Sequence, residues 1–290
     1  MDLFELDLYK EVESLASEKG YTMEVEIGAS DDPLGLAHHY VDYQNKKIEI
    51  VVPEGHPEII PIFVHELFHA KLFLGGFPRL LRSPEIQYTE LDEFLAQTIE
   101  DRAHHYYFYP LMRERGYMHD EENKVFAENL YNAMSDTNSP QEINFAFNVL
   151  EMDYRDPVLF QDYEQKIKKK TPNIYALYRR FKRLYSTIKN PRTMRESILK
   201  VCRQVESLTE KYGVEYSFKE KFNVPMIPND YEKGQLCSKY LIAKRLYPLK
   251  HQYIFEISSG QCVNVLDSSI FTDEKIKKIL DTEKINYLFN

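Results

Sequence analysis

Cysteine, glycine and proline are all scarce in this chain of 290 residues. The three cysteines, Cys202, Cys237 and Cys262, are far apart and form no CxxC pair. They exclude a disulfide-stapled miniprotein and are typical of reduced, buried thiols. Only 10 Gly and 14 Pro stand against 22 Tyr and 17 Phe, which excludes a largely disordered composition. The chain is long enough for one large domain or two modest ones.

Long apolar runs and an export signal are also missing. No stretch approaches the roughly 20 consecutive apolar residues that a membrane-spanning helix needs. Residues 1–15 carry five carboxylates and one Lys, whereas a signal peptide begins with basic residues and continues with an apolar run. We therefore expect a soluble cytoplasmic protein without a membrane partner.

The first 110 residues predict a small α+β domain. Apolar residues at helical spacing predict a helix from residue 2 to 19, ended by Gly20. Alternating residues 21–27, 37–43 and 47–52 predict three strands, with an Asp-Asp-Pro-Leu-Gly turn after the first and a hairpin between the other two. A helix that begins between Pro57 and Pro61 and stops at Gly75-Gly76 follows, and then a helix over about 87–107.

Residues 111–290 predict a mainly helical recognition or regulatory region. Helical patterns cover residues 120–135, 140–152, 157–170, 173–189 and 192–212. Near the end, residues 253–257 and 261–266 flank Ser-Ser-Gly and predict a short hairpin, and residues 272–280 predict a closing helix. The expected fold class is α+β, with domains at 1–110 and 111–290.

One motif carries chemistry. His65, Glu66 and His69 form an HExxH pattern within the helix that follows the predicted sheet. Residues four apart on a helix emerge on the same face, so both imidazoles can hold one zinc ion. Glu66 would then act as the general base on a water molecule and return the proton to the leaving amine. The motif predicts a Zn²⁺ cofactor and peptide hydrolysis.

A catalytic zinc usually has three protein ligands, and the HExxH motif supplies two of them. A metzincin would have a glycine three residues after His69 and a histidine six residues after it, but Leu72 and Gly75 stand there. The following helix offers Glu90 and Glu93.

Here the chain resembles the gluzincin clan of zinc metallopeptidases, whose third ligand is a Glu on a following helix, often in an ExxA context. Glu93 to Ala96 fits that context, so the resemblance implies Glu93 as the third ligand, with Glu90 as the alternative. Gln97 departs from the pattern, because several gluzincins have an acidic residue there that orients a ligand His.

The order of helix, small sheet, HExxH helix and Glu-bearing helix over residues 1–110 resembles the core of the ImmA/IrrE family of intracellular metallopeptidases. The resemblance implies a compact zincin fold and a strand, residues 48–52, that pairs with an extended substrate peptide. In the preceding strand His38 and His39 point to opposite faces, so at most one of them faces the cleft. We expect His104, about three helical turns after Glu93, to lie too far from it to share an ion.

A basic segment interrupts an otherwise acidic chain. Residues 165–204 hold 13 basic groups and 1 acidic group, whereas residues 1–110 hold 8 and 21. Tyr175, Tyr178, Phe181 and Tyr185 are interleaved with the basic residues, so the segment could bind nucleic acid, an acidic protein, or the acidic part of its own chain. A basic surface of this kind is also common as a solvated helix face.

The sequence as a whole predicts a zinc-dependent endopeptidase that hydrolyses an intracellular protein. Two alternatives remain open. One is a nucleic-acid-binding or protein-interaction regulator with a vestigial or sensing zincin core, and the other is a structural zinc site in an interaction protein.

Overall fold

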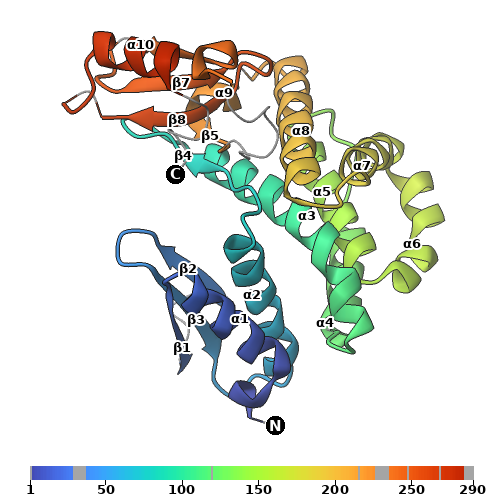
Figure 1. The fold of residues 1–290 in the computed structure, drawn as a ribbon. Coiled ribbons are helices and arrows are strands. Elements are labelled where there is room, and N and C mark those ends of the chain that lie inside the picture. The colour runs from blue at the N-terminus through green and yellow to red at the C-terminus, as the bar shows by residue number, and fades with distance from the viewer. Residues whose placement is uncertain are drawn as a thin grey trace. The chain divides into compact units, whose positions relative to one another are not determined.

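The computed structural model describes residues 2–28, 37–118, 120–214, 216–225, 235–246, 248–267 and 269–283. The chain has an α+β fold with several small sheets and many helices, as expected (Figure 1). It divides into two compact units, and each combines two separate stretches of sequence. Unit 1 contains Met1–Phe77 and Arg102–Ile188, and unit 2 contains Pro78–Asp101 and Lys189–Asn290.

The sheet of unit 1 has three strands in the order β1-β3-β2. Their bounds are Thr22–Gly28 for β1, His38–Asp42 for β2 and Lys47–Pro53 for β3. The hairpin of β2 and β3 is confirmed, and β1 pairs with β3 in parallel. The expectation that residues 48–52 pair with a substrate peptide is wrong, because β3 is the central strand and is hydrogen-bonded on both sides. The predicted turn over residues 31–35 lies outside the described residues.

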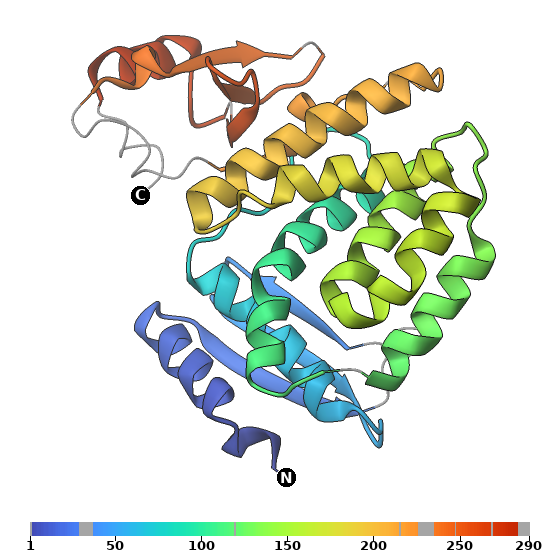
Figure 2. The same cartoon turned by 90° about the vertical axis from the view of Figure 1, so that its right-hand side faces the viewer.

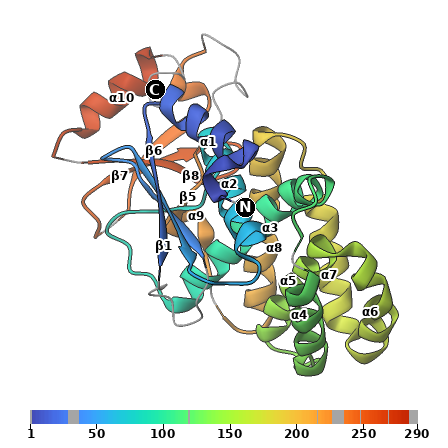
Figure 3. The same cartoon turned by 90° about the horizontal axis from the view of Figure 1, so that it is seen from below.

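Two helices pack beside this sheet, α1 (Asp7–Glu18) and α2 (Ile59–Leu74), as Figure 3 shows. A short 3-10 turn, Leu3–Glu5, precedes α1. The α2 helix is apolar on most of its circumference, and it buries Phe63, Val64 and Leu67 completely. A helix that is apolar all round is typical of a buried position. The HExxH motif therefore lies in the middle of a helix that the core holds on several sides.

The remaining part of unit 1 is helical (Figure 2, green to yellow). Its helices are the second half of α3 (Glu90–Glu114), then α4 (Asp120–Ala133), α5 (Gln141–Arg155), α6 (Pro157–Lys170) and α7 (Pro172–Tyr185). The α5 helix contacts α4, α6 and α7. Phe147 of α5 stacks on Phe181 of α7, with ring centroids 4.4 Å apart, and both side chains are fully buried.

Unit 2 contains the first part of α3, a long helix and two small sheets. Its further elements are β4 (Leu81–Arg82), α8 (Pro191–Lys211), α9 (Phe218–Lys221), β5 (Phe222–Asn223), β6 (Leu241–Arg245), β7 (Gln252–Glu256), β8 (Cys262–Leu266) and α10 (Asp273–Thr282). A 3-10 turn, Cys237–Lys239, precedes β6. The C-terminal hairpin and closing helix are confirmed, and all three cysteines are buried free thiols.

These units divide the chain differently from the predicted domains at 1–110 and 111–290. The α3 helix runs through Pro110 to Glu114, so no boundary falls there. The α-helical hairpins of residues 102–188 belong to the same compact unit as the N-terminal sheet. Among the described residues, no helix combines the length and apolar character that crossing a bilayer requires.

Candidate metal centre

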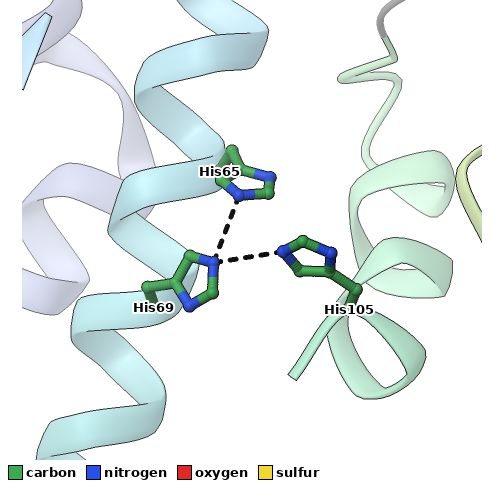
Figure 4. A group of neighbouring side chains, drawn as sticks. All are labelled: His65, His69 and His105. Atoms are coloured by element: carbon green, nitrogen blue, oxygen red, sulfur yellow. Dashed lines mark hydrogen bonds between the residues drawn. The ribbon is translucent and has the colours of Figure 1, made fainter. Parts of the chain in front are cut away.

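The α2 helix presents His65 and His69 one turn apart on the same face. Their Nε2 atoms lie 3.1 Å from each other, and Figure 4 shows the two rings turned toward the same point. His69 is buried and His65 is partly buried. The predicted pairing of the two HExxH histidines is therefore present in the structure.

The third member of the cluster is His105 of α3. Its Nε2 lies 3.3 Å from Nε2 of His69, and the three candidate ligand atoms all lie within 4.8 Å of one another. Zinc–nitrogen bonds of 2.0–2.1 Å in a tetrahedron place neighbouring ligand nitrogens roughly 3.3 Å apart. Two of the three spacings are therefore close to those of nitrogen atoms that share one tetrahedral ion.

The protonation state of these imidazoles is also compatible with metal binding. Burial, together with the neighbouring histidines, holds the pKa of His69 well below its ordinary value. Burial likewise lowers the pKa of His105, although the adjacent Glu151 opposes that shift. Both rings are neutral near pH 7, and the neutral imidazole is the form that coordinates a metal ion.

Glu66 lies beside the cluster and is fixed from the sheet. Its Oε2 is 2.7 Å from Nδ1 of His39 in β2, and its Oε1 is 4.0 Å from Nε2 of His65. The carboxylate is buried, and the His39 ring stacks on His69 with centroids 4.9 Å apart. His38 is exposed, which agrees with the alternation expected for adjacent residues in a strand.

His104 contacts His69 through the ring nitrogen that does not face the other two cluster histidines. Its Nδ1 lies 3.3 Å from Nδ1 of His69, and the side chain is buried. One of these nitrogens donates and the other accepts, so the contact leaves Nε2 of His69 directed at His65 and His105. The sequence places His104 only by its distance from Glu93, whereas in the structure it contacts His69, a member of the cluster.

Neither carboxylate proposed as the third ligand belongs to the cluster that the described residues form. Glu93 has an exposed side chain whose Oε1 is 2.9 Å from Nη2 of Arg82. Glu90 begins α3 and is exposed. Both lie in unit 2, while the three histidines lie in unit 1. Their assignment as ligands stays a sequence prediction without support from the cluster.

Sequence reasoning missed His105, although a signal was available. The pair His104-His105 lies on the helix that was already expected to carry the third ligand. Three histidines are as suitable for a catalytic zinc as two histidines and a glutamate. The ExxA context indicates a glutamate and gives no reason to consider a histidine.

The basic segment divides between the two units, with α6 and α7 in unit 1 and α8 in unit 2. Several of its charges pair inside their own unit, among them Lys182 with Asp153 and the buried Arg195 with Glu256. Tyr178, Phe181 and Tyr185 are fully buried, so these rings are not available to stack on bases. These contacts indicate that much of the basic segment packs and pairs within its own chain.

Comparisons with protein-family models, with curated proteins and with solved structures found no match to this chain.

Proposed function

We propose that the protein is a zinc-dependent peptidase in which His65, His69 and His105 hold the metal and Glu66 is the general base. The observation that carries the proposal is the convergence of three histidine nitrogens within 4.8 Å, with a buried carboxylate at their side. Three protein ligands leave a fourth tetrahedral position open, which is typical of catalytic rather than structural zinc sites.

Each residue has a task in this proposal. When bound, zinc would polarise the peptide carbonyl and lower the pKa of a water molecule. Glu66 would take the proton from that water and deliver it to the leaving nitrogen. His39 would donate to Oε2 of Glu66 and so leave Oε1, the oxygen 4.0 Å from Nε2 of His65, to accept the proton. The intracellular protein substrate expected from the sequence remains part of the proposal.

A histidine in place of glutamate departs from the gluzincin pattern, so the proposal rests on the HExxH geometry and not on the likeness to the ImmA/IrrE family. Glutamate between two metal-binding histidines on one helix is the arrangement that metallopeptidases use for hydrolysis.

The test uses the 290-residue chain loaded with one equivalent of zinc. Zinc content is measured by mass spectrometry, and cleavage is followed by liquid chromatography and mass spectrometry on casein and on a mixture of synthetic peptides. We expect one zinc per chain, cleavage by the wild type and no cleavage by Glu66→Gln. The control is Glu128→Gln, at an exposed glutamate of α4.

Two results would contradict the proposal. One is a protein that takes up no zinc, and the other is a Glu66→Gln variant as active as the wild type. Stoichiometric zinc without cleavage of any peptide would instead identify a structural site.

A further inference from the structure

Glu151 of α5 is a buried carboxylate that touches the metal centre from the helical part of unit 1. Its Oε2 is 2.7 Å from Nδ1 of His105 and 2.8 Å from Nη1 of Arg102. Its Oε1 accepts from the hydroxyl of Tyr109 at 2.9 Å and from Nε of Arg155 at 2.8 Å. Only 2% of the residue is exposed. Four donors thus occupy both oxygens of one carboxylate.

The donors keep this carboxylate ionised. The guanidinium groups of Arg102 and Arg155 carry permanent positive charges and can only donate, so a carboxylate that pairs with both of them is the ionised form. An ionised carboxylate only accepts hydrogen bonds. Every neighbour in hydrogen-bond contact with Glu151 must therefore present a proton to it.

This requirement determines the tautomer of His105. Nδ1 of a neutral His105 must carry the proton, because it faces the carboxylate, and Nε2 must then carry the lone pair. Nε2 is the atom that lies 3.3 Å from Nε2 of His69 within the cluster. The lone pair therefore points to where the metal would bind. A carboxylate that receives the second ring nitrogen of a metal-binding histidine orients the ring and makes it a better ligand.

We propose that Glu151 is a positioning residue of the metal centre, and that α5, which the sequence assigns to a separate recognition region, is a part of that centre. The proposal rests on the zinc site proposed above. Arg102, Tyr109 and Arg155 hold Glu151 in place, and Glu151 holds His105.

The experiment compares two variants of the 290-residue chain, Glu151→Gln and Asp153→Asn. Asp153 is the matched control, because it is also a buried carboxylate of α5. It accepts from Tyr178 at 3.0 Å and pairs with Lys182 of α7. Zinc affinity is measured by competition with a chromophoric chelator. The protonated ring nitrogen of His105 is identified in the metal-free protein by ¹⁵N NMR of labelled histidine.

We expect Glu151→Gln to weaken zinc binding by roughly 10- to 100-fold, the usual cost of losing such a partner. The amide has one acceptor oxygen where the carboxylate has two, so Arg102 and Arg155, which bond to different oxygens of Glu151, compete for it. Where Arg155 and Tyr109 hold that oxygen, the NH₂ takes the place of Oε2 and faces Nδ1 of His105. A donor at that position favours the tautomer with the proton on Nε2, which cannot bind the metal. The NMR spectrum should show this change in Glu151→Gln and not in Asp153→Asn, whose zinc affinity should stay near that of the wild type.

The outcomes separate this inference from the proposed function. A wild type that binds no zinc contradicts the proposed function, while the tautomer of His105 still tests the role of Glu151. Equal zinc affinity of wild type and Glu151→Gln overturns the inference alone, as does an equal loss in both variants. If Glu151→Gln does not fold, the wild-type spectrum decides, because a proton on Nε2 of His105 would refute the inference.

Discussion

Nδ1 of His39 lies 2.7 Å from Oε2 of Glu66, so an edge strand of the sheet holds the carboxylate of the HExxH helix. The same His39 ring stacks on His69, at an interplanar angle of 16°. One side chain of β2 thus contacts both the proposed general base and a proposed ligand. The hairpin of β2 and β3 fixes this position, because Ile50 of β3 is the partner of His39 in the register.

Replacing His39 should reduce turnover without removing the metal. His39→Phe keeps a ring against His69 but lacks the donor to Glu66, so we expect kcat to fall by about 10- to 100-fold, as misplaced catalytic groups do. His39→Asn should retain more activity, because its amide can donate from nearly the same place. Zinc content and KM should be unchanged. His38→Phe, at the exposed neighbour, is the control, and a drop in zinc content for His39→Phe would contradict this role.

The identity of the third ligand can be decided with two variants. His105→Ala should weaken zinc binding by more than about 100-fold, because even the loss of an outer partner costs 10- to 100-fold. Glu93→Ala should bind zinc like the wild type, since its side chain pairs with Arg82. Chelator competition measures both affinities. A larger loss of zinc affinity in Glu93→Ala than in His105→Ala would instead support Glu93 as the third ligand.

The helical part of unit 1 should depend strongly on one aromatic pair. Phe147→Ala removes a fully buried ring that stacks on Phe181, and we expect a loss of about 3–5 kcal/mol in the free energy of unfolding. Urea denaturation followed by circular dichroism measures it. Phe94→Ala, at a ring that is 41% exposed, should change stability by less than about 0.5 kcal/mol. Equal effects would contradict the packing described here.

Unit 2 should lose stability in acid through Asp92. Burial alone would raise its pKa, but the ammonium of Lys221 at 2.6 Å and the bonds from Thr89 lower it. The pKa of Asp92 is lower in the folded protein than in the unfolded chain, so between these two values the unfolded chain binds more protons. The contribution of Asp92 to the free energy of unfolding is therefore present above the unfolded pKa and is lost as pH falls through the folded pKa.

This acid dependence can be measured by urea denaturation of wild type and Asp92→Asn at neutral pH and at about pH 4, near the pKa of an unfolded aspartate. The decrease in the free energy of unfolding from neutral pH to about pH 4 should be smaller in Asp92→Asn than in the wild type. Lys221→Met should also show a smaller loss, because it removes the partner that lowers the pKa. If Asp92→Asn lost as much stability in acid as the wild type, Asp92 would not contribute to the acid dependence.

Local patterns were sufficient for most of the helices, for the three strands of the N-terminal sheet and for part of the site. The helices ended by Gly20 and Gly76, where the backbone has positive φ, followed from short-range preferences. Four-residue spacing on a helix gave His65 and His69, and strand alternation allowed only one of His38 and His39 to face inward. Each of these inferences uses residues that are neighbours in sequence.

The parts that were missed depend on contacts between distant residues. The β1-β3-β2 order places β3 at the centre of the sheet. The side chains of β3 alternate between buried and partly buried, and such alternation does not distinguish a central strand from an edge strand. His105 lies 36 residues from His69, and Glu151 lies 46 residues beyond His105. The two-residue strands β4 and β5 pair across more than a hundred residues and are too short to carry alternation.

The distance along the chain between His105 and Glu151 has a consequence for synthesis on the ribosome. At about 5–20 residues per second, the 46 residues that separate them take seconds to be translated. During that interval the nascent chain has all three histidines but lacks the carboxylate that sets the tautomer of His105. If the proposed zinc site forms as described, zinc loading would follow the emergence of α5, and a chain interrupted before residue 151 would carry the HExxH motif without the proposed positioning residue.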